Sequence, residues 1–467
     1  MNDETTPNLR LEEGESNLSW RRQRWADSKV SSQMKILLER DSARFLHQSV
    51  SSPCLAAVSK AEGIWIEDLD GHRYMDFHGN NVHHIGYSHP RLIAAIKQQL
   101  DELTFAPRRF TCEPAIELAE KLAEIVPGDL DKVLYATGGS DAIEIALKIA
   151  RAATGRYKTI SFWDSFHGAG FGGISVGGEQ QFRSHIAGPL LSGTEHVAPF
   201  ACYRCPYGYE VDENGAPVLD VCRTTCANMV RYVLEKEGDI AAVIAEPSRS
   251  VPYYSPPGFW KIVRDACNEM GALLIFDEIP TGLGKTGKMF ACEHDNVVPD
   301  ILVMGKALGG GMLPIAAAIC HSDLDVAGAF AIGHYTHEKN PITARAALTT
   351  INIVEEEGLV ENAARVGAFA LERLNDMKSR HSLIGDVRGR GLLLGVDLVV
   401  DRDSKEPAKD AAEAIYYHAL EVGLSFKLTM GNVISLSPPL VITEKEMHKA
   451  LDIIEDALAD VEKEGVQ

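Results

Sequence analysis

The 467-residue chain lacks an uncharged apolar run long enough to span a membrane, and its opening residues, Met1–Pro7, are too polar and acidic for a signal peptide. Positive charge is also scarce, since the net charge is −20, which argues against general nucleic-acid binding. The chain has neither internal repeats nor low-complexity tracts. We therefore expect a cytoplasmic protein with no nucleic-acid or membrane partner, in which a local cationic site holds any anionic ligand.

Cysteine is sparse and odd in number, with nine residues spread along the chain, which argues against a disulfide scaffold. Four cysteines cluster within a predicted insertion over residues 200–228, and they are Cys202, Cys205, Cys222 and Cys226. Their spacing is compatible with a zinc knuckle, and the alternative is a surface insertion without metal. The run Asp212–Gly215 between the pairs is typical of an ordinary hairpin turn, which favours the second interpretation.

Apolar, strand-like runs alternate with helical segments between about residues 110 and 330. This alternation predicts an α/β fold with a large, doubly wound, mostly parallel sheet. The expected strands are Lys132–Ala136, Thr159–Phe162, Ala241–Ala245, Ala272–Asp277, Ile301–Gly305 and Ile315–Cys320. The expected helices are Pro114–Ile125, Asp141–Ala153, Cys222–Lys236 and Gly258–Met270.

Both chain ends are expected to build a smaller α+β domain. Trp65–Leu69 and Arg73–Phe77 are predicted to form a hairpin, Ile384–Val400 is strand-rich, and two short strands precede the last helix. The expected divisions are an arm over 1–50, a first small-domain part over 51–105, a large domain over 106–345 and a second small-domain part over 346–467. The further predicted helices are Ser32–Leu46, Pro90–Leu103, Ala344–Glu356, Leu359–Ser379, Ala411–Val422 and Glu444–Glu464.

A lysine and an acid stand where two of the expected strands end. Lys306 follows a strand-like run and precedes a glycine turn, and Asp277 closes another strand. A lysine that is desolvated at such a place loses pKa and becomes a usable amine nucleophile. A Schiff-base lysine with an aspartate facing a pyridinium nitrogen is the protein's half of pyridoxal phosphate (PLP) chemistry. The alternative for the lysine alone is a structural role.

A glycine turn after another expected strand adds a candidate phosphate site. The segment Tyr135–Ala142 contains Gly138-Gly139-Ser140 directly before a helix, whose first N–H groups and dipole favour an anion. A plain strand-to-helix turn with a polar cap is the alternative. After the next strand, Phe166 is a candidate for stacking on a flat cofactor, or else a core aromatic residue.

These motifs occur in the order found in the class III (subgroup II) aminotransferases, which are fold-type I PLP enzymes, and the chain resembles that family over about residues 50–460. The segments that carry the resemblance are Thr137–Arg151, Phe166-His167-Gly168, Glu246-Pro247, Asp277-Glu278, Thr281–Gly287, Lys306–Gly311 and Thr336 with Asn340-Pro341. The resemblance implies a fold-type I enzyme with PLP as cofactor.

The resemblance also implies roles for single residues. Lys306 would bind the cofactor covalently and later shuttle protons, and Asp277 would keep the ring nitrogen protonated. The residues expected around the cofactor are Gly139, Ser140, Phe166, His167, Asp277, Lys306 and the partner's Thr336. Because this threonine comes from the other subunit, a homodimer with shared active sites is expected.

Two positions depart from the family's transaminases. Pro280 stands where many members have a glutamine that touches the cofactor's phenolic oxygen, and proline has no side-chain donor. Ser435 stands where an arginine often grips the substrate carboxylate, so a bidentate guanidinium is missing and Glu246 loses its usual partner. An oxo acid acceptor therefore lacks an obvious anchor.

These departures favour a lyase, which needs one substrate only. The chain resembles the ammonia-lyase branch that acts on (R)-1-hydroxy-2-aminoethylphosphonate, and this substrate enters through the resemblance alone. The alternatives are an ω-amine aminotransferase using pyruvate or 2-oxoglutarate, an ethanolamine-phosphate phospho-lyase and a non-catalytic binding protein of the same fold.

A phosphonate substrate requires cationic residues. The candidates for substrate binding are Arg108, Arg109, Glu246, Arg249, Lys339 and Lys427, and for each cation a solvated surface position is the alternative. His83 and His84 are further candidates for the pocket wall, or else core or surface histidines.

Overall fold

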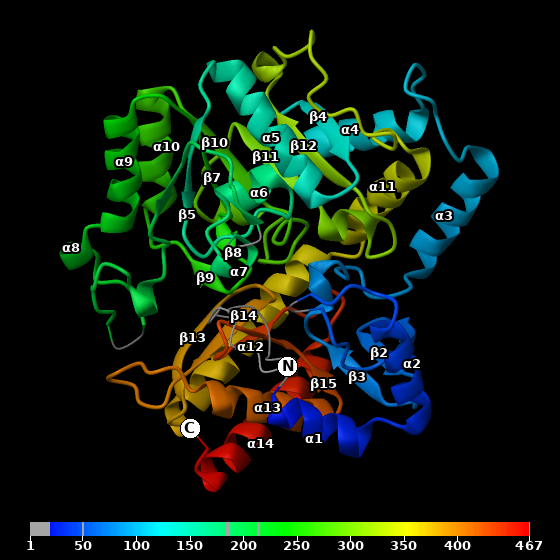
Figure 1. The fold of residues 1–467 in the computed structure, drawn as a ribbon, viewed down its shortest axis with the longest axis vertical. Coiled ribbons are helices and arrows are strands. Elements are labelled where there is room, and N and C mark those ends of the chain that lie inside the picture. Colours follow the sequence, from blue (N-terminus) through cyan, green and yellow to red (C-terminus); the bar gives the residue numbers. More distant parts are fainter. Residues whose placement is uncertain (1–18, 49–50, 184–186, 213–214, 467) are drawn as a thin grey trace. The chain divides into compact units, whose positions relative to one another are not determined.

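The computed structural model describes residues 19–48, 51–183, 187–212 and 215–466 (Figure 1). These residues divide into two compact units. The larger unit contains Asn80–His84 and Pro90–Glu361. The smaller unit contains the described residues up to Gly79, together with Ile85–His89 and residues 362–466. The chain therefore crosses between the units several times near its start.

A seven-stranded sheet forms the centre of the larger unit, in the order β4-β12-β11-β10-β7-β5-β6. Only β12 runs antiparallel to its neighbours, so the expected doubly wound, mostly parallel sheet is confirmed. The strands are β4 (Lys132–Ala136), β5 (Lys158–Phe162), β6 (Thr194–Val197), β7 (Ile240–Ala245), β10 (Leu273–Asp277), β11 (Ile301–Met304) and β12 (Ala316–Cys320). The edge strand β6 was not predicted, because its sequence, Thr-Glu-His-Val, is not apolar.

The inner strands are buried because helices cover the sheet. Every residue of β7, β11 and β12 is buried. The helix α5 (Gly139–Thr154) packs against β4, β7, β10, β11 and β12. Its Ile143, Leu147 and Ala150 join Ile244 and Ile275 in one apolar core. Burial of such side chains contributes about 1.5–3 kcal/mol each, so this core holds the carboxyl ends of the strands in fixed positions.

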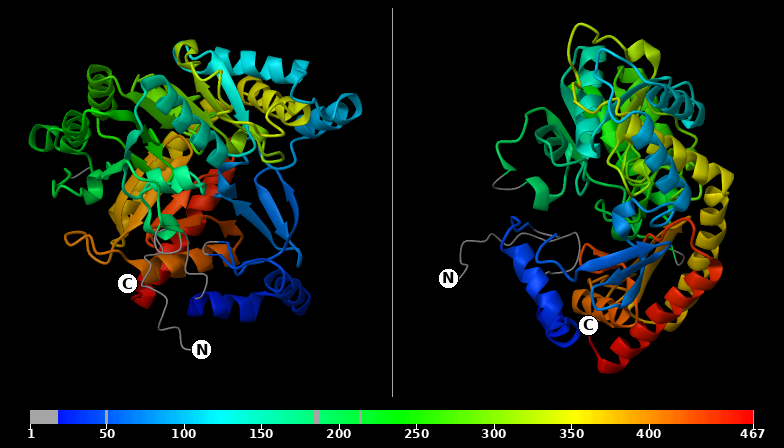
Figure 2. Two further views of the ribbon diagram at one scale, coloured as in Figure 1. Left: turned by 45° about the horizontal axis from the view of Figure 1, so that its top comes forward. Right: turned by 90° about the vertical axis from the view of Figure 1, so that its right-hand side faces the viewer.

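Two predicted helices are wrong in their boundaries, and the first, Ser32–Leu46, ends at Ser42. Instead of a continuous helix over Cys222–Lys236, the chain forms α8 (Leu219–Cys222) and α9 (Thr225–Glu237). Arg223 and Thr224 both have φ of 49°, a left-handed conformation that cannot continue a right-handed helix. Beyond this break, α9 packs against α10 (Phe259–Met270) (Figures 1 and 2).

The helix α11 (Pro341–Glu356) belongs to the larger unit, because it packs against α3 (Pro90–Glu102) and α4 (Glu113–Ile125) (Figure 1). The division between the units therefore follows Glu361 rather than residue 345, and α3 also lies in the larger unit rather than in the small-domain part. The other expected divisions remain predictions. The remaining short elements of this unit are η1 (Gly79–Asn81), α6 (Phe171–Val176), α7 (Gln180–Arg183), η3 (Cys202–Arg204), β8 (Ser248–Arg249), β9 (Tyr253–Tyr254), η4 (Ala291–His294), η5 (Lys306–Gly309) and η6 (Ser322–Leu324).

The smaller unit contains two four-stranded sheets, ordered β1-β2-β3-β15 and β13-β14-β17-β16. The predicted hairpin is present as β2 and β3, and three short strands rather than two precede the last helix. The strands are β1 (Val58–Glu62), β2 (Trp65–Asp68), β3 (Arg73–Asp76), β13 (Ile384–Arg390), β14 (Leu393–Leu398), β15 (Leu424–Ser425), β16 (Lys427–Thr429) and β17 (Val433–Leu436). The helices are α1 (Trp20–Lys29), α2 (Ser32–Ser42), α12 (Leu359–Arg380), α13 (Lys409–Glu421) and α14 (Glu444–Glu464), of which α1 was not predicted.

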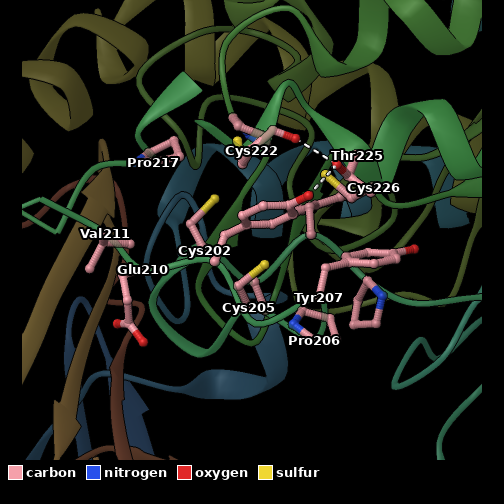
Figure 3. A pocket seen from close by; sticks show the side chains of 15 residues that line it. Cys202, Cys205, Pro206, Tyr207, Glu210, Val211, Pro217, Cys222, Thr225 and Cys226 are labelled. Carbon is pink, nitrogen blue, oxygen red and sulfur yellow. Dashed lines mark hydrogen bonds between the residues drawn. The ribbon is translucent and has the colours of Figure 1, made fainter. Parts of the chain in front are cut away.

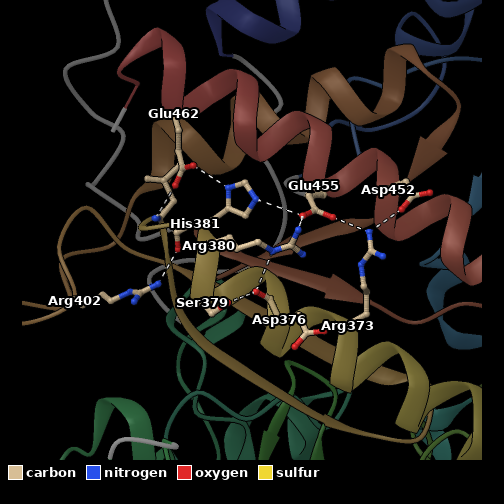
Figure 4. Close-up of polar contacts among 10 residues, drawn as sticks. Arg373, Asp376, Ser379, Arg380, His381, Arg402, Asp452, Glu455 and Glu462 are labelled. Carbon is tan, nitrogen blue, oxygen red and sulfur yellow. Dashed lines mark hydrogen bonds and ion pairs between the residues drawn. The ribbon is translucent and has the colours of Figure 1, made fainter.

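Ion pairs join α12 to α14 in the smaller unit (Figure 4). Arg373 lies 2.8 Å from Asp452 and 2.7 Å from Glu455, and Arg380 reaches the same glutamate at 2.6 Å. His381, just after α12, lies 2.8 Å from Glu462. A single exposed pair contributes about 0–1 kcal/mol, but a connected set fixes how the two helices align.

None of the helices in the described part of the chain combines the length and the apolar composition that a membrane span requires.

The close approach of α12 to a glycine turn gives a test of the smaller unit. A Cβ atom at Gly367 would lie 2.0 Å from the carbonyl oxygen of Gly391, so the backbone must move to admit it. We expect Gly367→Ala to lower the free energy of unfolding by about 1–3 kcal/mol, measured by urea denaturation. Ala364→Ser, at an exposed position of the same helix, is the control. An unchanged urea midpoint in the first variant would contradict this packing.

Candidate active site

The candidate residues of the larger unit lie at the carboxyl ends of parallel strands. Asp277 ends β10, Lys306 follows β11, and Glu246 follows β7. His167 lies in the loop after β5, and Gly139 follows β4. The carboxyl ends of parallel strands share one edge of the sheet, where open α/β folds bind ligands. The sheet order therefore brings together five residues that are far apart in the sequence.

Asp277 is held by two donors in a buried position, with 3% of its surface exposed. Its Oδ2 atom lies 2.8 Å from Nδ1 of the buried His167, and its Oδ1 atom accepts a hydrogen bond from the Ile279 N–H at 3.1 Å. Within the described residues, Nε2 of His167 is buried and has no hydrogen-bond partner. The carboxylate is thus fixed in orientation, as a partner for a pyridinium nitrogen must be.

The glycine turn before α5 is packed tightly against its neighbours. A Cβ atom at Gly139 would lie 2.8 Å from Cδ1 of Ile279, and one at Gly168, where φ is 107°, would lie 2.7 Å from Oγ of Ser140. Gly138 caps the helix without a side chain, and in the described part of the chain the N–H groups of Gly139 and Ser140 have no acceptor. These donors at a helix start fit a phosphate group.

Lys306 does not have the expected desolvated environment, because its side chain is exposed in the single chain. It lies beyond β11 rather than inside it, and it begins the short helix η5 with φ of 45°. A left-handed conformation is uncommon for lysine and occurs often at functional sites. Ile279 lies 3.3 Å from the Cβ position of Gly305, so the lysine turn adjoins the turn after Asp277.

Two further residues expected at the cofactor are accessible. Phe166 is 39% exposed, and its ring centroid lies 4.5 Å from that of Phe182. One part of its ring is therefore available to stack on a ligand. Thr336 is exposed on the segment before α11. Arg108 makes a short contact with His334 of the same segment, so Arg108 and Thr336 lie in one region of the chain.

Glu246 and Arg249 extend the buried cluster around Asp277. Burial and then the nearby Asp277 raise the pKa of the Glu246 carboxyl, while His167 and Arg249 act in the opposite direction. Its Oε2 atom accepts a hydrogen bond from the Ser250 N–H at 2.9 Å. Glu246 is therefore partnered by the backbone of its own turn.

Among the candidate cations only Arg249 is buried, with 5% of its surface exposed. Arg108, Arg109 and Lys339 are exposed, which matches the surface alternative. Lys427 is half-buried in β16 of the smaller unit, directly opposite the buried Ser435 of β17. The sequence left Arg249 open to a surface interpretation, because burial of a single arginine has no signature in a chain of mixed polarity.

Several buried polar residues were missed or left undecided by the sequence. The side chains of Lys285, His83 and His84 are buried. Burial, then Lys285 and His83, hold the pKa of His84 well below its usual range, with a smaller effect from Lys306. His84 therefore lies close to Lys306, whereas the sequence left open whether it lines the pocket.

Glu278, next to Asp277, supports the turn that carries the site. It accepts hydrogen bonds from the Thr281 hydroxyl at 2.5 Å and from the Cys292 N–H at 2.8 Å. Burial raises the pKa of this carboxyl from 4.5 to about 7, against the opposite effect of these donors. The neighbouring Pro280 is also buried and provides no side-chain donor.

The four clustered cysteines line one small cavity, together with Tyr207 and other side chains (Figure 3). All four are free thiols. In the described residues, no group of three or more His, Cys, Asp or Glu side chains is placed to hold a metal ion, so the zinc interpretation gains no support. Of the predicted hairpin turn, residues 213–214 lie outside the described residues, while Val211 and Pro217 on either side form a bridge.

A doubly wound sheet with a buried carboxylate, a lysine after a neighbouring strand and an open helix start defines a fold-type I PLP enzyme. The chain belongs to the class III aminotransferase family, since the family model "Aminotransferase class-III" matches residues 47–458. The cofactor is PLP, and the expected family and fold are confirmed.

Curated relatives span nearly the whole chain. The chain is 46% identical over 459 residues to (R)-1-hydroxy-2-aminoethylphosphonate ammonia-lyase of Vibrio splendidus, covering 97% of this chain and 96% of that protein. It is 38% identical to leucine/methionine racemase of Thermococcus litoralis, covering 88% and 92% of the two chains. The resemblance to the ammonia-lyase branch is therefore confirmed.

Solved structures of aminotransferases have the same fold. A Bacillus anthracis aminotransferase matches with a TM-score of 0.84 and 32% identity, over 93% of this chain and 100% of the other. An amine transaminase from an uncultivated Pseudomonas species, in its PLP-bound form, matches with a TM-score of 0.81 and 32% identity, over 90% and 99%.

The residues present fit this cofactor. When bound, PLP acts as an electron sink that stabilises negative charge on the amine-bearing carbon of a substrate. Asp277 would hold the proton on the ring nitrogen, and Gly139 with Ser140 would bind the phosphate. The Lys306 amine, which is exposed and follows the adjacent strand, would hold the ring and carry a proton to and from the substrate carbon.

Replacing the candidate lysine tests this assignment. We expect Lys306→Ala to bind PLP without covalent linkage and to lose turnover by roughly 10³-fold or more. Absorbance of the yellow holoprotein and the loss of cofactor on dialysis after borohydride treatment measure the linkage. Lys261→Ala, at an exposed position of α10, is the control. Full activity in the Lys306 variant would rule out the assignment.

The buried Glu278 gives the apoprotein a pH dependence. Since its pKa is about 7 in the folded chain and about 4.5 when unfolded, the folded state binds this proton more tightly. The resulting stability is fully present below pH 4.5 and is lost as the pH rises through 7, by up to about 3 kcal/mol. We expect Glu278→Gln to reduce the fall in unfolding free energy between pH 5 and 8, measured with urea. Parallel pH curves for both proteins would show that Glu278 does not titrate in this range, and Glu120→Gln is the exposed control.

Proposed function

We propose that this PLP enzyme is an ammonia-lyase that acts on (R)-1-hydroxy-2-aminoethylphosphonate and releases phosphonoacetaldehyde and ammonia. The observation that carries the proposal is the 46% identity to an ammonia-lyase of that name over 97% of the chain. In support, position 435 in β17 is a buried serine, where many transaminases of the family have an arginine for a carboxylate. A lyase needs no oxo acid, so it has no use for that arginine.

The bond changes in this reaction balance without a co-substrate. A proton leaves the amine-bearing carbon, and the bond from the neighbouring carbon to its hydroxyl oxygen breaks, which gives water. The enamine that remains takes up a proton at the phosphonate-bearing carbon and gives up its N–H proton. Water then adds to the carbon that bears the nitrogen, and ammonia leaves. Lys306 is the base we assign to the first step, because this residue is exposed in the single chain and lies at the same sheet edge as Asp277.

We also propose a homodimer in which the partner's Thr336 completes the phosphate site. Thr336 is exposed in the single chain, so it is available to another subunit. Phe105, Phe110 and Phe330 are exposed aromatic side chains of the larger unit, and such residues are enriched in subunit interfaces. These observations support a shared site and agree with the pattern of the family.

A second candidate is an ω-amine aminotransferase, which the similarity to the PLP-bound amine transaminase favours. That activity requires an amino acceptor such as pyruvate or 2-oxoglutarate. An ethanolamine-phosphate phospho-lyase is a third candidate, in which phosphate rather than hydroxide leaves. The three reactions differ in products, so one set of assays separates them.

The test is to incubate holoenzyme with (R)-1-hydroxy-2-aminoethylphosphonate in the absence of any oxo acid. We expect catalytic release of ammonia and phosphonoacetaldehyde, measured by a coupled ammonia assay and by phosphorus NMR, with Lys306→Ala as the inactive control. O-phosphoethanolamine and 2-aminoethylphosphonate are run in parallel. Turnover that appears only with pyruvate or 2-oxoglutarate would overturn the lyase proposal in favour of the aminotransferase.

A further inference from the structure

A buried arginine without a carboxylate partner lies beside the candidate active site. Arg249 and Ser248 form the two-residue strand β8, which pairs with Tyr253 and Tyr254 of β9. The strand begins two residues after Glu246, whose pKa Arg249 lowers, so the guanidinium lies near the Glu246 carboxyl group. This hairpin is therefore at the same edge of the sheet as the cofactor residues.

The contacts of Arg249 in the described part of the chain are to backbone and aromatic groups, and Glu246 interacts with it at longer range. One terminal nitrogen donates to the backbone carbonyl of Asp164, and the guanidinium lies 5.6 Å from the ring centroid of Tyr253. Its Nε atom is buried and finds no hydrogen-bond partner among the described residues. Within residues 19–48, 51–183, 187–212 and 215–466, no carboxylate forms an ion pair with this side chain.

Ser248 adds a second unpartnered donor at the same place. Its side chain has no exposed surface, and within the described residues its hydroxyl is buried with no hydrogen-bond partner. A buried hydroxyl without a partner lowers the stability of the folded chain, and so does a buried charge without an ion-pair partner. Two such groups on adjacent residues are unfavourable for a structural turn, but they are suited to an anion that arrives from outside.

We propose that Arg249 and Ser248 form the subsite that binds the phosphonate group of the substrate. A guanidinium presents two parallel N–H donors that match two oxygens of a phosphonate, and the serine hydroxyl can donate to one of them. The chain carries a net charge of −20, so a dianion needs a local cation to bind at all. The other candidate cations are exposed or lie in the smaller unit. This assignment rests on the proposed function, because that function identifies the anion as a phosphonate. The evidence for an anion site comes from Arg249 and Ser248 alone.

The test measures binding without turnover. Holoenzyme, in which the cofactor already fills its own phosphate site, is titrated with ethylphosphonate by calorimetry. We expect Arg249→Met to weaken ethylphosphonate binding by at least tenfold and Ser248→Ala by several fold, with partial recovery in Arg249→Lys. Lys261→Met, an exposed change on α10, should bind like the parent protein. Acetate in place of ethylphosphonate should show little dependence on residue 249, because it carries one charge less.

Kinetics and stability separate ligand binding from a structural role. For ammonia release, we expect Arg249→Met to raise KM more than it lowers kcat, while the thermal midpoint of the ligand-free protein changes little. Should Arg249→Met fail to fold, Arg249→Lys and Ser248→Ala give the same comparison. Unchanged ethylphosphonate affinity and KM in Arg249→Met, with both weakened in Lys427→Met or Arg108→Met, would overturn the proposal.

The outcomes also distinguish this inference from the proposed function. If the parent protein releases no ammonia but its ethylphosphonate affinity depends on Arg249, the lyase assignment fails and the anion subsite stands. If ammonia is released and Arg249→Met keeps both ethylphosphonate affinity and KM, the subsite fails and the lyase assignment stands.

Discussion

The hydrogen bond between Asp277 and His167 is the contact on which the arrangement of the site depends. It joins the end of β10 to the loop after β5, two strands that are separated in the sheet by β7. A buried carboxylate is unfavourable unless donors surround it, and here the His167 ring and the Ile279 N–H provide them. The same bond fixes the loop that carries Phe166 and Gly168. The position of Asp277 therefore determines where the ring of Phe166 lies and where Gly168 contacts Ser140.

The sequence predicted the central sheet well, because its strands are buried on both faces and are therefore continuous apolar runs. For β7 and β11, for example, both predicted strand ends lie within one residue of the observed ends. The edge strand β6 lacks this signal, and the break at Arg223 and Thr224 depends on backbone angles that neither residue type favours. Tertiary contacts determine such features.

The candidate catalytic residues were predicted from motif order, whereas the burial of the residues around them could not be predicted. Lys306 and Asp277 stand in distinctive segments, so their positions at strand ends could be read from the chain. The exposure of Lys306, by contrast, depends on where the strand stops and the turn begins. The burial of Arg249 depends on a short hairpin whose pairing no periodic pattern indicates. Only the folded chain shows which of several cations is removed from water.

The placement of β8 and β9 outside the seven-stranded sheet has an evolutionary consequence. Substitutions in this two-residue ladder leave the hydrogen bonds of the main sheet intact, so the anion subsite that we propose there can change without altering that sheet. The aspartate, in contrast, is the last residue of the central strand β10, and the lysine follows the central strand β11 after one residue. A scaffold divided in this way allows new substrates to be acquired by changing a peripheral turn while the inherited chemistry persists. Racemases, transaminases and lyases can accordingly share one architecture.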